Sequence, residues 1–205
     1  MRTQVNLAVF VSGGGTNLQA LIDARSSGRL KSAEICLVVS DRAEAYACER
    51  ARRHGIPVEI LTEDSSVWEA KVQEVLQRYQ IDFIVLAGFL RILSKEFTQK
   101  YSRRILNVHP SLIPSFCGAG FYGLKVHEAA LAKGVKVTGA TVHFVNEIPD
   151  GGEILAQKAV RVQAGDTPRS LQRRVMRLAE HVLLPQVTEA VAAELLREEE
   201  KHASV

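Results

Sequence analysis

The fold is indicated first by residues 5–28, which read VNLAVFVSGGGTNLQALIDARSSG. Residues 5–11 form a short apolar run, and three glycines stop it. From residue 16 the apolar side chains recur at helical spacing until Gly28. A strand that passes through a glycine turn into a helix is the opening unit of a parallel sheet with crossover helices.

The same alternation continues along the first half of the chain. Apolar runs of strand length alternate with amphipathic segments of helix length, as expected for crossover connections between parallel strands. The predicted strands are 34–40, 58–61 and 82–88, and the predicted helices are 43–55 and 66–80.

The second half has a different pattern. A short helix is predicted over 126–134, followed by strands over 136–145 and 153–162 that pair antiparallel around a turn. A last helix runs from about 167 to 199, with a bend expected at Pro185. The predicted fold is therefore α/β: a doubly wound, mostly parallel sheet, with antiparallel strands toward the C-terminal half and a long C-terminal helix. Without repeats or a clear linker, one domain over residues 1–205 is the simplest organisation.

Composition restricts the class of protein. The chain has 205 residues, 46% of them hydrophobic, and a formal net charge of +3, which is too small to indicate a nucleic-acid surface. Its three cysteines share no metal-like spacing and imply no disulfide framework. The N-terminal apolar run is too short for a membrane span and lacks a signal-peptide pattern. We expect a cytoplasmic protein without a membrane or nucleic-acid partner.

The glycine loop after the first predicted strand, SGGGTN, has two interpretations. It can be a tight turn with a helix cap, or it can bind a phosphate through backbone N–H groups at a helix N-terminus. It matches neither the dinucleotide fingerprint nor the Walker loop. Three consecutive glycines exceed what a turn needs, and this favours the anion site.

A second polar motif, NVHPSLIP, follows the apolar residues at 105 and 106. Alternation along a strand places Asn107 and His109 on one face, and Pro110 directs the chain away from the sheet in an extended path. Ligands of open α/β sheets bind beyond the carboxyl ends of strands. A packed core histidine is the alternative, but the location and the neighbouring amide favour acid–base or oxyanion chemistry.

The remaining candidates for catalysis are fewer. Ser111 lies in no nucleophile elbow, and His109, His127 and His143 lack the spacing of a metal site, so no metal is expected. A carboxylate that orients the imidazole is required, and Asp150 in IPDGG is the candidate. Asp-Gly-Gly is also ordinary turn chemistry, and both interpretations of Asp150 remain open at this point.

Several segments together resemble the phosphoribosylglycinamide formyltransferase family of folate-dependent formyltransferases. The resemblance covers essentially the whole chain and implies the family's reaction. That reaction transfers a formyl group from 10-formyltetrahydrofolate to the amine of N1-(5-phospho-D-ribosyl)glycinamide in purine biosynthesis. It needs small-molecule substrates and no metal. The segments are SGGGTNLQALI, VVSDRAEAYACERARRHGIP, VLAGFLRIL, ILNVHPSLIPSF, TGATVHFVNEIPDGG and AGDTP.

The resemblance also implies roles for individual residues. Asn107, His109 and Asp150 match the family's catalytic trio, and Asn107 and Asp150 are implied to contact the folate as well. A second set is implied to bind the ribonucleotide: Gly15, Thr16, Asn17 and Glu180. A third set is implied to bind the folate: Leu90, Arg91, Ile92 and Leu93.

Three departures from the family pattern stand out. Trp68 falls near a position where some members carry an arginine that contacts the folate tail. Cys117 replaces a common proline, and the following run, GAGFYGLKVHE, is bulkier than in many members. An extra residue precedes Glu180 in the final helix.

Three rival functions are weighed against the sequence. A methionyl-tRNA formyltransferase shares the Asn-x-His-Pro-Ser motif but needs an RNA-binding domain and a basic surface. A formyltetrahydrofolate hydrolase uses water as acceptor and usually carries an extra N-terminal domain. A non-catalytic nucleotide-binding module has a similar fold, but the trio of Asn107, His109 and Asp150 argues against it. A monomer and a homodimer are both compatible with the sequence.

Overall fold

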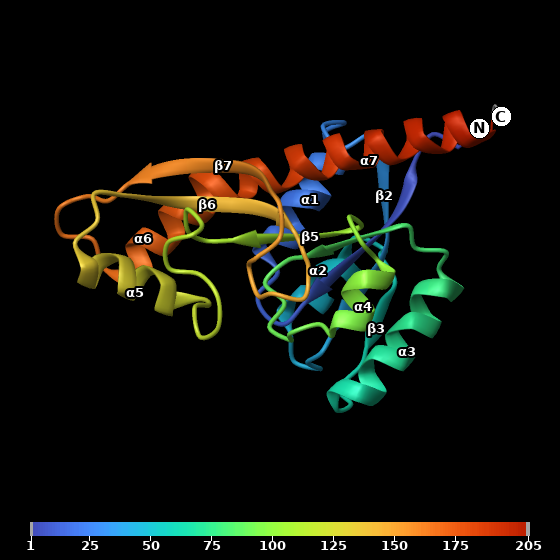
Figure 1. Ribbon diagram of the computed structural model, residues 1–205, viewed down its shortest axis with the longest axis horizontal. Coiled ribbons are helices and arrows are strands. Elements are labelled where there is room, and N and C mark those ends of the chain that lie inside the picture. Colours follow the sequence, from blue (N-terminus) through green and yellow to red (C-terminus); the bar gives the residue numbers. More distant parts are fainter. Residues whose placement is uncertain (1, 204–205) are drawn as a thin grey trace. The chain divides into compact units, whose positions relative to one another are not determined.

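The computed structural model describes residues 2–203, except for the side chains of Ser66, His202 and Ala203. The chain divides into two compact units (Figure 1). Unit 1 comprises Met1–Leu93 and Pro185–Val205, and unit 2 comprises Ser94–Leu184. The single domain over residues 1–205 stays a prediction.

Unit 1 contains four parallel strands. They are β1 (Val5–Val11), β2 (Ala33–Ser40), β3 (Val58–Ile60) and β4 (Phe83–Leu86). β1 pairs with β2 on one side and with β4 on the other, and β3 pairs with β2. The strands read as continuous apolar runs because the sheet is covered on both faces, and the side chains of β4 are all buried.

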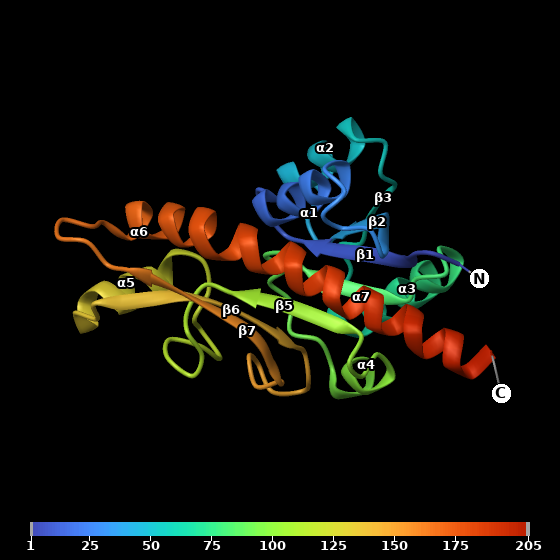
Figure 2. The ribbon, with the colours of Figure 1, turned by 90° about the horizontal axis from the view of Figure 1, so that it is seen from above.

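Three helices connect these strands: α1 (Thr16–Ser26), α2 (Tyr46–Arg53) and α3 (Ser65–Arg78). α1 and α2 pack side by side, on the side of β1 away from α3 (Figure 2). The chain moves outward from β1 through β2 to β3, and then returns to β4 on the other side of β1. Because crossover connections are right-handed, this change of direction places α3 on the opposite face of the sheet from α1 and α2.

The C-terminal helix α7 (His181–Ala203) begins in unit 2 and continues through unit 1. Within unit 1, the Glu189 carboxylate accepts hydrogen bonds from the backbone N–H groups of Lys31 and Ser32 at 2.7 and 2.9 Å. Arg2 forms ion pairs with Asp82 and Glu199, and these connect the segment before β1 to the C-terminal part of α7. α7 is thereby anchored within unit 1 at Glu189 and at Glu199.

Unit 2 contains three antiparallel strands, β5 (Ile105–His109), β6 (Val137–Phe144) and β7 (Ile154–Arg161). β6 is buried along almost its whole length, whereas β7 exposes most of its residues. Gly139 in β6 permits a close approach, because a Cβ there would lie 2.1 Å from the Lys158 carbonyl oxygen and 2.8 Å from Leu112 Cδ2. The segment that follows β5 therefore packs directly on β6.

The helices of unit 2 are α4 (Lys95–Lys100), α5 (Leu124–Lys133) and α6 (Pro168–Val175). α5 packs against α6. A π-helical turn, η1 (Met176–Glu180), follows α6, contacts β6 and β7, and joins α7 directly. Pro185 lies inside α7, shortly after this π turn, and the bend expected there stays a prediction.

The predicted α/β fold with a parallel sheet, later antiparallel strands and a long C-terminal helix is confirmed. α4 was not predicted. The described part of the chain holds no helix of the length and apolarity that a membrane span needs.

Candidate active site

The polar motif at the end of β5 forms two cross-strand rows with β6. Asn107 pairs with His143, and His109 pairs with Thr141. Residues directly opposite each other in antiparallel strands share a face of the sheet. The alternation inferred from the sequence therefore extends to a second strand, and four polar side chains lie on one face. His109, Thr141 and His143 are buried, with at most 4% of each residue exposed.

Asp150 lies in the turn between β6 and β7 and reaches back to both rows. Its Oδ2 lies 3.4 Å from His109 Nδ1 and accepts a 2.8 Å hydrogen bond from the Gly118 N–H. Its Oδ1 accepts a 3.3 Å hydrogen bond from Asn107 Nδ2. Asp150 has a left-handed backbone, with φ of 56°, which suits an aspartate in a turn. It is thus both a turn residue and a partner of the histidine.

His109 lies between two hydrogen-bond acceptors. Its Nε2 is 2.9 Å from the Phe116 carbonyl oxygen, and its Nδ1 faces the Asp150 carboxylate. Both contacts are satisfied at once only when both ring nitrogens carry protons, so the geometry fits an imidazolium. Burial nevertheless lowers the pKa of His109, and the raising effects of Asp150 and the Phe116 carbonyl do not offset it. Asp150 acts to raise the pKa of His109 as expected, but the net shift of this pKa is downward.

The Asp150 carboxyl is held in its ionised form. Burial acts to raise its pKa, but the nearby His143 ring, the charge of His109 and the Gly118 N–H together lower the pKa below its ordinary value. An ionised Asp150 opposite His109 is the arrangement that favours a charged imidazole.

His143 is a site residue that sequence reasoning considered only as a metal ligand. Its Nδ1 lies 2.7 Å from the Phe144 carbonyl oxygen and donates to it. Its Nε2 accepts from Asn107 Nδ2 at 3.2 Å and lies 3.5 Å from Asp150 Oδ1. His143 therefore orients the Asn107 amide. The available signal was a histidine inside an otherwise apolar strand pattern, TVHFV.

A further histidine, His127 of α5, is fully buried, and neither of its ring nitrogens has a hydrogen-bond partner. Burial, together with the charge of His109, lowers the pKa of His127 to about 4. It is therefore neutral at physiological pH. Among the described residues, no group of three or more His, Cys, Asp or Glu side chains is arranged to hold a metal ion.

The predicted ribonucleotide loop lies at the carboxyl end of β1. α1 begins after Gly15 without a side-chain cap and without an acidic residue in its first turn, so its positive dipole end is uncompensated. Arg50 Nε donates to the Gly14 carbonyl at 2.8 Å, and the Ala47 N–H donates to the Gly13 carbonyl at 3.0 Å. These bonds from α2 hold the loop in shape.

The three glycines of this loop are not equivalent. Gly15 has φ of 70°, and a Cβ there would lie 2.6 Å from Ala47 Cβ, so packing against α2 requires a glycine. Gly13 and Gly14 are exposed, and nothing lies within 4 Å of a Cβ added to either. Packing explains one glycine and leaves two that suit a ligand. Thr16 is half-buried, and Asn17 is buried.

The predicted folate segment follows β4, beside this loop. The Leu90 N–H donates to Ser12 Oγ at 2.9 Å, which joins the two segments at the edge of the unit 1 sheet. Leu90 and Ile92 are 45% and 70% exposed, whereas Leu93 is buried. Two exposed aliphatic side chains at the end of a strand suit an apolar ligand surface.

Trp68 belongs to the core of unit 1. It is 1% exposed and packs against Phe10 and Phe89, with ring centroids 5.8 and 5.4 Å apart. The guanidinium of Arg91 lies 5.4 Å from the Trp68 ring, and Arg91 Nε is 3.5 Å from Asp41 Oδ2. Trp68 therefore supports Arg91 and is not itself a surface for a folate tail.

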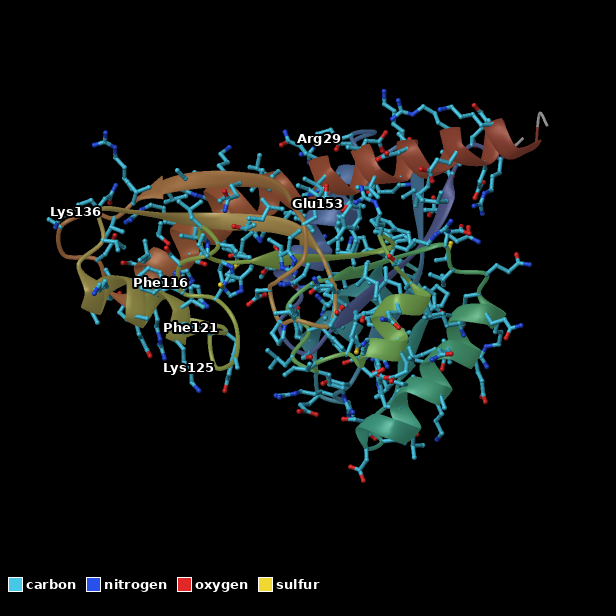
Figure 3. All side chains as sticks on the ribbon, viewed as in Figure 1. Arg29, Phe116, Phe121, Lys125, Lys136 and Glu153 are labelled. Carbon is cyan, nitrogen blue, oxygen red and sulfur yellow. The ribbon has the colours of Figure 1, made fainter. Side chains whose placement is uncertain are left out.

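The other predicted positions lie in unit 2. Glu180 is buried at the end of η1, and a π turn accommodates an extra residue within a helix. The loop from β5 to α5 carries Phe116 and Phe121, and Lys125 follows in the first turn of α5 (Figure 3). The two phenylalanine rings stack edge to face at 6.4 Å. Burial raises the pKa of the half-buried Cys117 thiol, which makes it a weak nucleophile.

Comparison with known proteins identifies the family. Residues 5–188 match the family described as formyl transferase. The chain belongs to the formyl transferase family. The phosphoribosylglycinamide formyltransferase of Escherichia coli (strain K12) is 38% identical to this chain, over 89% of this chain and 85% of that relative.

Two further relatives have names that refer to the same kind of transferase. A protein of Arabidopsis thaliana named phosphoribosylglycinamide formyltransferase, chloroplastic, is 41% identical over 93% of this chain, which spans 66% of that relative's length. The crystal structure of glycinamide ribonucleotide transformylase 1 from Symbiobacterium toebii superposes with a TM-score of 0.86 at 38% identity, covering 95% of this chain and 90% of that one. The resemblance inferred from the motifs is confirmed.

Proposed function

We propose that this family member transfers a formyl group from 10-formyltetrahydrofolate to the amine of N1-(5-phospho-D-ribosyl)glycinamide, in de novo purine biosynthesis. The observation that carries the proposal is the convergence of Asn107, His109 and Asp150 in unit 2, with both ring nitrogens of His109 facing acceptors. Names of relatives at about 40% identity support the same reaction.

The amine of the ribonucleotide attacks the formyl carbon, so the enzyme needs no nucleophile of its own. Asn107 Nδ2 and protonated His109 donate to the oxyanion of the tetrahedral intermediate, which requires each of them to give up one of its hydrogen bonds to a protein acceptor. Preorganisation of such donors is the main source of rate in acyl-transfer sites. Asn107 is held by His143 and Asp150, so its amide is oriented before substrate binds.

Asp150 has two roles in this proposal. Its negative charge favours the imidazolium of His109 against the effect of burial. Its Oδ2 also fixes the loop at Gly118. The proton that the attacking amine releases passes to solvent or to the leaving folate nitrogen, with His109 within reach as an acid–base group.

Most of the proposed binding groups lie in unit 1. Gly15, Thr16 and Asn17 bind the substrate phosphate at the N-terminus of α1. The 90–93 segment binds the folate, through Leu90 and Ile92 as apolar contacts and the supported guanidinium of Arg91. Glu180 in unit 2 contacts the ribose hydroxyls as an acceptor.

The remaining parts of the proposal concern partners and location. The substrates are small molecules, no metal takes part, and neither nucleic acid nor a membrane is a partner. The enzyme acts as a monomer or homodimer in the cytoplasm. A location in an organelle is the alternative, since the Arabidopsis relative is named chloroplastic.

The test is an assay of the purified protein with 10-formyltetrahydrofolate and three acceptors. Formyl transfer to glycinamide ribonucleotide, with none to initiator methionyl-tRNA and little to water, is the expected result. Folate consumption that does not depend on the ribonucleotide would identify a hydrolase. Absence of folate turnover, together with nucleotide binding, would identify a non-catalytic module.

A further inference from the structure

A third strand continues the row that holds His109. In the antiparallel register of unit 2, His109 pairs with Thr141, and Thr141 pairs with Gln157 of β7. The three side chains therefore share one face of the sheet. Gln157 is exposed, and a glutamine on an exposed edge strand ordinarily donates its hydrogen bonds to water.

Gln157 instead donates within the protein. Its Nε2 donates to the Ile113 carbonyl at 2.9 Å and to Thr141 Oγ1 at 3.0 Å. Thr141 Oγ1 accepts also from the Ile113 N–H at 3.1 Å and donates to the Ser111 carbonyl at 2.7 Å. The threonine hydroxyl thereby makes three hydrogen bonds, the maximum for its one proton and two lone pairs.

Apart from the bond between Gln157 and Thr141, these bonds all reach the turn that directly follows His109. Within the turn, Ser111 Oγ donates to the Ser115 carbonyl at 2.5 Å, and the Ser115 N–H donates to the Leu112 carbonyl at 3.0 Å. The next residue is Phe116, whose carbonyl faces His109 Nε2 at 2.9 Å. Gln157 is thus connected to the imidazole by these hydrogen bonds together with the covalent link from Ser115 to Phe116.

Packing supports the same connection independently of the hydrogen bonds. Leu112, in the middle of the turn, lies over Gly139 of β6, where a Cβ would come within 2.8 Å of its Cδ2. Gly139 shares a face with Thr141, two residues further along the strand. The turn is therefore both packed on the sheet and bonded to it.

We propose that Gln157 and Thr141 are positioning residues, which fix the 111–115 turn on the sheet and so hold the Phe116 carbonyl against His109. This inference rests on the proposed transfer reaction, since it assigns the two residues to the same site. They do not touch substrate, and they act on the rate through the orientation and burial of His109.

The experiment compares Gln157→Leu, Thr141→Val and the double variant with a matched control, Thr138→Val. Thr138 is also buried in β6, but its hydroxyl has no hydrogen-bond partner. We expect kcat to fall by about 10- to 100-fold in each single variant, the range for a catalytic group displaced by about 1 Å. The double variant should lose little more than either single variant, because both act through one turn. The control should keep wild-type kcat, and KM for the ribonucleotide should stay unchanged throughout.

A second measurement does not depend on turnover. The titratable groups facing His109 are Asp150, His143 and His127, and all three remain in these variants. Loosening the turn admits water to His109, and its pKa, lowered by burial, should rise toward the ordinary histidine value of about 6.5. A ¹³C NMR titration of labelled histidines, with His109→Ala for assignment, measures this shift. A role in stability alone lowers Tm and leaves the pKa of His109 unchanged in the folded protein.

The outcomes are distinct. An unchanged pKa of His109 in folded Gln157→Leu, or equal loss of kcat in Thr138→Val and Thr141→Val, overturns the positioning role. Absence of formyl transfer in the wild-type protein overturns the proposed function, while the NMR shift still decides whether the turn positions His109.

Discussion

The two units bury different kinds of chemistry. Among the described residues of unit 1 the buried polar ones are few, and none of them is charged or a histidine: Ser12, Asn17, Ser40 and Thr188. Unit 2 buries three histidines and a glutamate: His109, His127, His143 and Glu180. Unit 1 therefore offers a ligand mainly backbone and a helix terminus, whereas unit 2 offers oriented side chains that can exchange protons.

This difference explains the division of labour in the proposed reaction. A phosphate needs a fixed array of N–H groups, which a glycine loop on a parallel strand supplies without titratable groups. Stabilisation of a developing oxyanion needs donors that are already oriented and partly desolvated. Unit 2 provides them by opposing polar residues across antiparallel strands. Changes in unit 2 should then affect kcat, and changes in the unit 1 loop should affect KM.

The largest effect is expected from His109→Ala. We expect kcat to fall by about 10²–10⁴-fold, the range for loss of an acid–base or oxyanion group, with small changes in KM for either substrate. Steady-state kinetics measure both constants. The matched control is His54→Ala, an exposed histidine at the end of α2 in unit 1, which should leave kcat unchanged. Near-wild-type kcat in His109→Ala would remove His109 from the mechanism.

Asp150→Asn is expected to lower kcat/KM by about 10²-fold, because it removes the charge that opposes the burial of His109. Asn tolerates the left-handed φ of 56° at this position, so the turn and the melting temperature should survive. Without the carboxylate the pKa of His109 falls further, and the limb of the pH–rate profile that requires imidazolium moves to lower pH. If the pH–rate profiles of wild type and Asp150→Asn coincide, Asp150 serves only as a turn residue.

The sequence was most informative where local patterns determine structure. Strands and helices of unit 1 follow from apolar runs of 4–8 residues between amphipathic segments, and Asn107 and His109 share a face because alternation is local. α4 was missed because six residues are too few to display a helical period. Its one local signal was Ser94, whose Oγ accepts from the Phe97 N–H at 3.1 Å as an N-cap.

The remaining features depend on contacts between distant residues. His143 reaches Asn107 only through the register of β6 against β5, which a long intervening segment leaves undetermined in the sequence. Gly15 is a glycine because Ala47 of α2 packs against it, and Trp68 is in the core because Phe10 and Phe89 surround it. In each of these cases the sequence shows that a residue is unusual, but the residue it contacts is known only from the folded structure.

The buried histidines of unit 2 should also make its stability depend on pH. The pKa of His127 is lowered to about 4, against about 6.5 in the unfolded chain, so below pH 6.5 the unfolded state binds a proton that the folded state does not. Stability is therefore fully present above pH 6.5 and is lost as the pH falls toward 4. At pH 5 the loss should be about 2 kcal/mol, or roughly 30-fold in the unfolding equilibrium.

Urea unfolding of wild type and His127→Leu at pH 7 and pH 5 measures this contribution. Leucine has a similar volume and cannot titrate, so the variant should lose less stability than the wild type between the two pH values. The exposed His54→Leu is the control and should behave as the wild type does. An equal loss in His127→Leu and wild type would show that His127 is not the buried group that titrates.

The smallest effect on kinetics is expected from substitutions in the SGGGTN loop of unit 1, where Gly14 and Gly15 should respond differently. Gly14→Ala adds a methyl group where nothing lies within 4 Å, so folding should be unaffected, but the methyl group obstructs an anion that approaches the backbone. KM for the ribonucleotide should rise about tenfold, equivalent to 1.4 kcal/mol, with kcat at saturation and folate KM unchanged.

Gly15→Ala should instead lower stability by more than about 1 kcal/mol, because of its φ of 70° and the contact with Ala47. Thermal unfolding and steady-state kinetics of both variants distinguish the two cases. A ribonucleotide KM that Gly14→Ala leaves unchanged would make the loop a turn only, and a fall in kcat without a change in KM would contradict the division between a binding unit and a catalytic unit.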